Sequence, residues 1–342
     1  MRMRLALIFS LAISLAAQDP EFNVESRLVL VPVTVTDTKG RSVDGLEASD
    51  FLIYDNGVRQ RAVVDTLGTG VAPIALVIAV QSSGISAPAL AKVQKIGGMI
   101  QPLITGERGC AAVVAFDDRV RWRQECTNDP DALSRAFYSL QPGAQKSARM
   151  LDAVHEAVER LRRRPNARRV LLLISESRDR GSESELETVV IAAQAAGVSV
   201  YTFSYSAFRT AFTTTTSKND TPPEPKMPRA TRNEPLSMQG RVPIPQAEQR
   251  VDILGGIGEL TRLGKTNDTE VLTKATGGMT FPFTRQKGLE DAIARLGVEL
   301  HSQYVLSFTP ESPAAGYHGL EVRVSRPGEF HIRARPGYWS LQ

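Results

Sequence analysis

Both ends of the chain carry short apolar runs of the kind that form strands. Residues 27–36 are rich in β-branched side chains and are followed by a turn, which indicates a strand. The run 50–55 leads into Asn56 and Gly57, a pair typical of a type I′ hairpin turn, so we expect residues 61–65 to return as its partner strand. Near the other end, further strands are predicted at 304–308, 320–324 and 330–335.

Hydrophobic runs alternate with helical patterns in the middle of the chain. Residues 74–80 are almost continuously apolar, as in a central parallel strand covered on both faces, and apolar positions recur at helical spacing within 89–104. The elements predicted next are strands 110–116 and 120–126 around a turn at 117–119, helices 131–140 and 148–163, strand 170–175, helix 183–196 and strand 198–205. This order predicts an α/β fold with a doubly wound, mostly parallel sheet and one antiparallel strand.

Residues 207–250 interrupt this alternation. The segment is rich in Thr and Pro and has too few large apolar side chains to form a core, so we interpret it as a mobile insertion. After it, helices are predicted at 251–263, 268–275 and 289–302, with a short strand at 279–283. We expect four parts, namely a signal peptide 1–17, a β unit 22–68, an α/β domain 72–302 that carries the insertion, and strands 303–342. Because neither β flank is large enough to bury a core alone, we expect the two to pack together.

The composition fits a globular protein of about two domains. The chain has 342 residues, of which 42% are hydrophobic and 23% charged, and its mean hydropathy of −0.16 excludes a polytopic membrane protein. The formal charge of +4 includes Arg2 and Arg4 of the leader, and the remainder is too small to indicate nucleic-acid binding. A cluster of arginines lies around the end of the predicted helix 148–163, and we interpret it as solvated charge that stabilises the helix end. Its members are Arg160, Arg162, Arg163, Arg164, Arg168 and Arg169. Binding to an anionic partner or to an envelope surface is the alternative.

The start of the chain has the features of a signal peptide. Arg2 and Arg4 precede an apolar run at 5–15, and the small residues Ser14 and Ala16 stand where a signal peptidase expects them. A buried N-terminal strand is the alternative. No segment reaches the ~20 apolar residues that a membrane-spanning helix needs. We therefore expect an exported protein, periplasmic or secreted, with no membrane span.

In an exported protein, Cys110 and Cys126 are candidates for a disulfide rather than for a catalytic or metal-binding pair. The predicted hairpin turns around Asp118, and in a symmetric hairpin the two cysteines lie directly opposite each other, within bridging distance. Two unpaired cysteines with an apolar role are the alternative. The sequence thus predicts a disulfide across this hairpin.

The stretch Val77-Ile-Ala-Val-Gln-Ser-Ser-Gly-Ile-Ser86 resembles the first strand and loop of a von Willebrand factor type A domain. The order of the predicted elements agrees with that family, and the flanks 30–37, 303–306 and 333–338 resemble the bacterial, acidobacterial-type VWFA-related proteins. The resemblance implies a Rossmann-like sheet. It also implies a metal ion-dependent adhesion site, built from an Asp-x-Ser-x-Ser loop, a Thr from a second loop and an Asp after the fourth strand. Such a site gives a hard cation its oxygen ligands and leaves one position for a partner's carboxylate.

Seven residues of this chain fall on or beside the family's ligand positions: Gln81, Ser83, Ile85, Ser86, Ser147, Ala148 and Glu176. Gln81 stands at the first Asp and carries no charge, whereas Ser83 keeps the first Ser. Ile85 and Ala148 offer no side-chain oxygen, although each adjoins a serine, and Glu176 replaces the last Asp with a longer carboxylate. The resemblance therefore implies a degenerate site that binds no metal. If an ion is retained, Mg²⁺ is the candidate, with Ser83 and Glu176 as its ligands.

No catalytic constellation accompanies this degenerate site. Ser82 and Ser83 lie on a strand-to-helix turn, but the G-x-S-x-G pattern is absent. A hydrolase is disfavoured because the four histidines stand in no triad-like context. They are His155, His301, His318 and His331. Asp179 and Glu183 lie near the site, and we interpret them as solvated carboxylates rather than metal ligands.

We predict a non-enzymatic, extracytoplasmic protein-interaction module of von Willebrand type A fold, which acts as an adhesion or scaffold protein. It is expected to need no cofactor and to bind a protein partner rather than nucleic acid. The alternative is a metal-dependent adhesion protein, or an accessory factor of a metallo-enzyme, that retains a divalent ion at the altered site.

Overall fold

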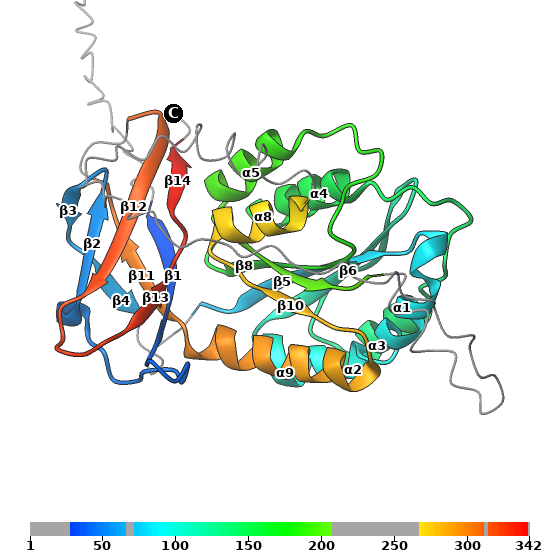
Figure 1. Cartoon of the computed structure of the whole chain (residues 1–342), viewed down its shortest axis with the longest axis horizontal. Coiled ribbons are helices and arrows are strands. Elements are labelled where there is room, and N and C mark those ends of the chain that lie inside the picture. Colours follow the sequence, from blue (N-terminus) through cyan, green and yellow to red (C-terminus); the bar gives the residue numbers. More distant parts are fainter. Residues whose placement is uncertain (1–27, 66–71, 207–266, 311–313, 341–342) are drawn as a thin grey trace, which may run out of the picture.

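The computed structural model describes residues 28–65, 72–206, 267–310 and 314–340. At its centre lies a six-stranded sheet with helices on both faces (Figure 1). The strand order is β10-β9-β8-β5-β6-β7, and every neighbouring pair is parallel except β6 and β7. The strands are β5 (Ile74–Gln81), β6 (Cys110–Phe116), β7 (Val120–Thr127), β8 (Arg168–Ser175), β9 (Val198–Ser204) and β10 (Thr280–Pro282). The predicted fold class is confirmed.

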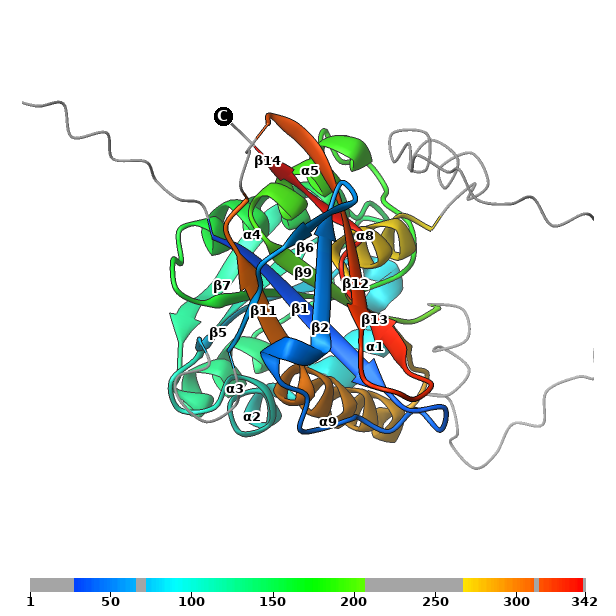
Figure 2. The ribbon, with the colours of Figure 1, turned by 90° about the vertical axis from the view of Figure 1, so that its left-hand side faces the viewer.

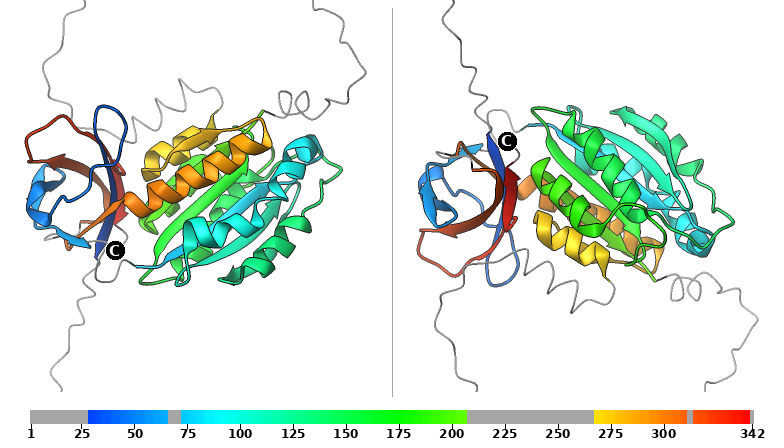
Figure 3. Two further views of the ribbon diagram at one scale, coloured as in Figure 1. Left: turned by 90° about the horizontal axis from the view of Figure 1, so that it is seen from below. Right: turned by 90° about the horizontal axis from the view of Figure 1, so that it is seen from above.

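Alternate residues of the central strands face two helical layers (Figure 3). On β5, Leu76 and Ile78 pack against one layer, and Val77 and Ala79 pack against the other. The first layer consists of α1 (Ala87–Val93), α2 (Gly97–Ile100), α3 (Pro130–Tyr138) and α9 (Gln286–Ser302), and the second of α4 (Met150–Arg162), α5 (Leu186–Ala195) and α8 (Asp268–Thr276). All residues of β5 are buried, so coverage of both faces explains its continuous apolar run.

The single helix expected over 89–104 is broken in the structure. It divides into α1, α2 and a wide turn η3 (Gln101–Thr105). The break brings Gly97 against α3, where a Cβ on Gly97 would lie 2.7 Å from the Ser134 Cα. Pro102, inside η3, has no N–H to donate to a regular helical hydrogen bond. Close packing on α3 therefore overrides the helical periodicity of the sequence.

Strands from both ends of the chain share two four-stranded sheets (Figure 2). One sheet has the order β13-β1-β11-β4 and the other β14-β12-β2-β3. The strands are β1 (Val29–Thr36), β2 (Phe51–Asp55), β3 (Val58–Gln60), β4 (Val63–Asp65), β11 (Tyr304–Phe308), β12 (Gly316–Val324), β13 (His331–Arg333) and β14 (Gly337–Ser340). Val31, Ile53 and Leu306 are fully buried in the core that these strands enclose. Each end of the chain thus supplies part of a core that the other end completes.

The first hairpin differs from its prediction. Asn56 and Gly57 have φ of 48° and 81°, as a type I′ turn requires, but the strand that pairs with β2 is β3 rather than residues 61–65. The chain then leaves this sheet, and β4 pairs with β11 in the other sheet. β14, which the sequence pattern did not predict, forms the edge of the second sheet. Strand switching of this kind is decided by which sheet offers a free edge, and no local pattern encodes it.

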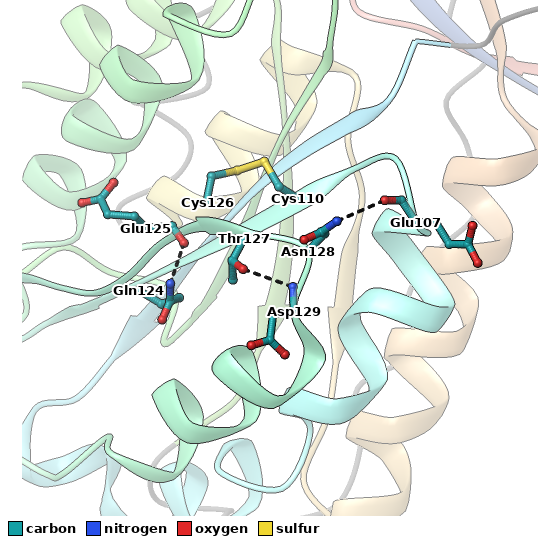
Figure 4. Close-up of a disulfide and its surroundings, with 8 residues drawn as sticks. All are labelled: Glu107, Cys110, Gln124, Glu125, Cys126, Thr127, Asn128 and Asp129. Atoms are coloured by element: carbon teal, nitrogen blue, oxygen red, sulfur yellow. Dashed lines mark hydrogen bonds between the residues drawn. A yellow bond between two sulfur atoms is a disulfide. The ribbon is translucent and has the colours of Figure 1, made fainter.

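The disulfide between Cys110 and Cys126 joins β6 to β7, with 5.3 Å between the Cα atoms (Figure 4). The ladder is irregular here, because Val114 pairs with Trp122 near the turn but Ala111 pairs with Thr127 at the far end. The two cysteines are therefore not directly opposite, as the symmetric hairpin predicted. They bridge diagonally, and their Cα separation lies within the usual range for a disulfide.

Four arginines bind the C-terminal ends of helices. Arg168 and Arg169 of β8 do so within the α/β layers, whereas Arg333 and Arg335 join the C-terminal β segment to those layers. Arg168 donates to Leu300 O at the end of α9 (2.8 Å), and Arg333 donates to Gly277 O just after α8 (2.7 Å). Arg169 and Arg335 reach Ala196 O and Gln194 O at the end of α5. Helix C-termini carry partial negative charge and unpaired carbonyls, which guanidinium groups satisfy. Arg168 is only 6% exposed, so its interpretation as solvated charge is wrong.

Three sequence predictions lie outside the described residues. They are the signal peptide 1–17, the insertion 207–250 and the helix 251–263. Among the residues that are described, no helix is long and apolar enough to cross a membrane.

Candidate functional site

The carboxyl ends of β5 and β8 lie beside each other at one edge of the central sheet. β5 pairs with β6 on one side and with β8 on the other, so the loops after these strands start side by side at this edge, which is where open α/β sheets generally bind ligands. After β5 the chain makes a tight turn, η2 (Gly84–Ser86), and α1 begins directly after it. We call this place the edge site. Its residues are Gln81, Ser83, Ile85, Ser86, Ser147, Ala148 and Glu176.

Gln81 is buried at the edge site and links the loop after β5 to the loop after β8. Its side chain is 2% exposed, and its Nε2 donates to Ser83 Oγ at 2.9 Å. Its Oε1 accepts from the Glu176 backbone N–H at 2.9 Å, which ties the end of β5 to the loop after β8. Ser83 Oγ and Ser86 Oγ share a further hydrogen bond of 3.0 Å. A neutral amide suits this position because it supplies one donor and one acceptor, whereas a carboxylate would supply acceptors only.

Glu176 is the carboxylate of the edge site, and it forms an ion pair with a neighbouring arginine. Its side chain is mostly buried, and Arg180 Nη2 donates to its Oε2 at 3.1 Å. Behind it, burial raises the pKa of the Tyr205 hydroxyl, so this group stays neutral at physiological pH. The polar groups of the edge site are therefore buried neutral donors and acceptors together with one ion pair.

The second loop reaches the edge site through its backbone. Gly84 N donates to Gln145 O at 2.8 Å, and Ala148 exchanges two backbone hydrogen bonds with Arg180 (3.0 and 2.9 Å). Ala148 is fully buried and brings no side-chain oxygen, while Ser147 and Ile85 are half-buried. The structure thus brings together the three segments that the sequence assigned to the site, from after β5, before α4 and after β8.

Asp117 lies at the same edge, after β6, where the sequence pattern predicts only a turn residue. It is buried, and Arg121 donates to both of its carboxylate oxygens (2.8 and 2.7 Å). Burial alone would raise the pKa of Asp117, but hydrogen bonds from Arg121 and from the Arg119 backbone hold the pKa below its ordinary value. Its position directly after a buried strand of the same sheet was the signal that could have found it.

Asp179 and Glu183, which the sequence predicts to be solvated carboxylates near the site, differ in the structure: Asp179 is half-buried, and the Glu183 side chain is 82% exposed. Asp179 accepts from the Leu151 N–H at 3.0 Å in the first turn of α4. Glu183 forms an ion pair with Arg149. Within the described part of the chain, no group of three His, Cys, Asp or Glu side chains is arranged to hold a metal ion.

The most conspicuous histidine lies in the β sheets, away from the edge site. His318 is buried, with Nδ1 2.9 Å from Asp55 Oδ1 and Nε2 2.8 Å from the Ala314 carbonyl oxygen. Its ring stacks on Tyr338, whose hydroxyl donates to Asp55. The nitrogen that a catalytic dyad would turn toward a nucleophile faces a backbone carbonyl here. The cluster is therefore arranged as a structural core contact.

No family model matches the chain, and no curated protein matches it. Solved structures are similar to it in fold. The conserved hypothetical protein BatB from Bacteroides thetaiotaomicron is 11% identical with a TM-score of 0.43, and the alignment covers 67% of this chain and 98% of BatB. An aerotolerance-related membrane protein from Bacteroides fragilis is 13% identical with a TM-score of 0.39, covering 66% and 99% of the two chains. A von Willebrand factor type A protein from Catenulispora acidiphila is 10% identical with a TM-score of 0.44, covering 94% and 65%. At these identities and TM-scores the similarities transfer no function to this chain.

Proposed function

We propose that this chain is a non-enzymatic, extracytoplasmic protein-interaction module that presents the edge site to a protein partner without using a metal ion. The observation that carries the proposal is the Gln81 amide, which satisfies Ser83 Oγ and the Glu176 N–H together. A partner would then be recognised by shape and by hydrogen bonds around this edge.

The electrostatics of the edge site support metal independence. Mg²⁺ requires a near-octahedral set of oxygen ligands, usually with carboxylates among them. Here Glu176 is paired with Arg180, and Asp117 is paired with Arg121. A cation would have to compete with a guanidinium at each of these carboxylates. It would also have to break the Gln81–Ser83 hydrogen bond to gain the hydroxyl oxygen.

Export is supported by the disulfide and by the leader pattern. Disulfides persist in oxidising compartments, and Cys110 and Cys126 form one. Arg2, Arg4 and the apolar run at 5–15 have the pattern of a signal peptide. The proposed location is the periplasm or the extracellular medium.

The second candidate is an altered metal site. Ser83 Oγ and Ser86 Oγ lie 3.0 Å apart, and the Gln81 amide links Ser83 to the backbone of Glu176, which favours this possibility over a catalytic role. In that function the chain would be a metal-dependent adhesion protein or an accessory factor of a metallo-enzyme.

Calorimetry with Mg²⁺, Mn²⁺ and Ca²⁺ separates the two candidates. The proposal predicts no binding in the micromolar range. Micromolar binding that Glu176→Ala abolishes would establish the altered metal site instead.

Partner binding is tested with proteins captured by proximity labelling in the native cell envelope. Capture should survive EDTA and should weaken about tenfold or more in Glu176→Ala. Glu321→Ala is the matched control, because Glu321 also pairs with an arginine, Arg323, but lies on β12 away from the edge site. Equal loss in both variants would contradict the assignment of this face.

A further inference from the structure

A pocket of about 650 Å³ lies between α4 and the strands β6 and β7. Val77 of β5 and Ala112 of β6, which are partners in the ladder between those two strands, form its apolar floor. Leu161 of α4 and Cys126 of β7 also line it. Its volume lies within the range of small-molecule sites, about 300–1,000 Å³.

The pocket lies where the central sheet extends beyond the helical layer on this face. α4 packs on β5, β6 and β8, whereas β7 packs on α3 in the other layer. Trp122 and Cys126 of β7 face the α4 side of the sheet, and both are only half-buried. On that side, β7 therefore borders a hollow whose floor is the sheet itself.

Contacts between lining residues join β7 to α4 and hold the pocket open. Trp122 Nε1 donates to Glu156 Oε2 at 3.0 Å, and Arg160 forms an ion pair with Glu125. The Arg160 guanidinium also lies over the Trp122 ring, 3.6 Å from its centroid. The disulfide fixes β7 to β6 beside these contacts. The two walls are thus tied together, as in a pre-formed ligand site.

Three polar side chains of the lining have no protein partner for their free groups among the described residues. His155 Nδ1 is buried without a hydrogen-bond partner, which is costly unless another molecule supplies one. Arg163 and Arg164, directly after α4, are exposed and form no ion pair with a described carboxylate. The lining carboxylates, in contrast, are engaged, because Glu159 pairs with Arg162 and the other two make the contacts given above.

The charge balance at the pocket favours an anion. Three carboxylates line the pocket, and four guanidiniums lie on or beside them, so one positive charge is in surplus. The C-terminus of α4 offsets roughly half a charge and leaves the balance positive. The apolar floor favours a hydrophobic body, and the Trp122 ring favours an aromatic one. A small inorganic anion would meet the arginines but leave this floor uncovered.

We propose that this pocket binds a small organic acid, with its apolar ring on the sheet floor beside Trp122 and its carboxylate at Arg163 and Arg164. A polar substituent on the ring can meet His155 Nδ1, which donates or accepts according to its tautomer. The edge site precedes α4 and the two arginines follow it, so the two sites lie at opposite ends of this helix. The inference is therefore independent of the proposed function.

Fluorescence of the full chain tests the pocket with two matched probes. 3-Phenylpropionate and 3-phenylpropylamine share a ring and a short linker but carry opposite charges. The chain has two tryptophans, so Trp339→Phe leaves Trp122 as the reporter of the pocket. We expect the acid to change the Trp122 emission and to bind about tenfold more tightly than the amine. Excess acetate, which has no apolar body, should not compete.

Variants in the same background locate the binding. Arg163→Gln combined with Arg164→Gln should weaken binding of the acid about tenfold and remove its advantage over the amine. Arg59→Gln combined with Arg61→Gln is the matched control, because both arginines are exposed in the β unit, and it should change neither affinity. Ala112→Leu places a larger side chain on the floor and should abolish binding of both probes, with circular dichroism reporting whether the fold is kept.

Equal affinities for the acid and the amine, or binding of the acid that the Arg163 and Arg164 exchange leaves unchanged, would overturn the proposal. No Trp122 response to the acid in the millimolar range would also overturn it. If Ala112→Leu does not fold, the arginine pair still decides the question. Vesicles that contain phosphatidylglycerol are the last comparison. If they bind the chain through the same arginines while the acid does not bind, these arginines contact a membrane surface and the proposal is wrong.

Discussion

Replacing Gln81 by methionine tests whether its amide locks the edge site. Methionine fills nearly the same volume but makes no hydrogen bond, so packing is kept while polar contacts are removed. Two hydrogen bonds are lost, one to Ser83 Oγ and one from the Glu176 N–H. At ~1 kcal/mol each, with ~1–2 kcal/mol more for the N–H left unpaired, the free energy of unfolding should fall by about 3–4 kcal/mol.

Gln194→Met provides a matched control. Gln194 is also 2% exposed, but among the described residues its side chain makes one hydrogen bond, from Nε2 to Ala275 O, and finds no partner for its buried Oε1. Losing that bond costs ~1 kcal/mol, and removing the unpaired oxygen offsets a similar amount. We therefore expect Gln194→Met, which makes the same substitution at the same burial, to leave the free energy of unfolding nearly unchanged.

Urea unfolding of both variants, followed by circular dichroism, measures the difference directly. The midpoint should fall for Gln81→Met with an unchanged denaturant slope, because the exposed surface does not change. If the two variants lose equal stability, or if Gln81→Met loses less than about 1 kcal/mol, the amide does not hold the site together. Partner binding by Gln81→Met should weaken in parallel, since the loop after β8 loses its tie to β5.

Three further predictions follow from contacts elsewhere. Exchanging Cys110 and Cys126 for serine should lower the free energy of unfolding by up to ~3 kcal/mol, and mass spectrometry of unreduced peptides should find the two cysteines joined. Arg333→Met should cost about 3 kcal/mol in the same unfolding assay because it leaves Glu299 buried without its cation, and adding Glu299→Gln should restore much of that loss. The lowered pKa of Asp117 predicts stability that is complete above the ordinary aspartate value of about 4 and is lost as the pH falls through the lowered value. Asp117→Asn should reduce the loss of unfolding free energy at acid pH. An unchanged dependence of the unfolding free energy on pH would contradict the prediction.

The sequence alone determined the type and position of the secondary-structure elements that are fully buried. β5 is covered on both faces, so its apolar run had only one interpretation, and the turn between β6 and β7 was placed by Asp117 and its neighbours. Candidate site positions were found for a similar reason. A residue that directly follows a buried parallel strand must lie at the sheet edge, which placed Gln81 and Glu176 near each other.

Tertiary structure alone decided which groups meet. Nothing local to Gln81 shows that its amide accepts from a backbone N–H 95 residues away. Arg168 has the sequence context of a solvated cation but is buried at the end of α9, and the helical pattern is broken before Gly97 because α3 packs against that residue. The hydrophobic periodicity of a segment indicates which of its residues face the core and which face solvent. Hydrogen-bond partners, helix breaks and strand exchange depend on distant segments, whose positions exist only once the chain has folded.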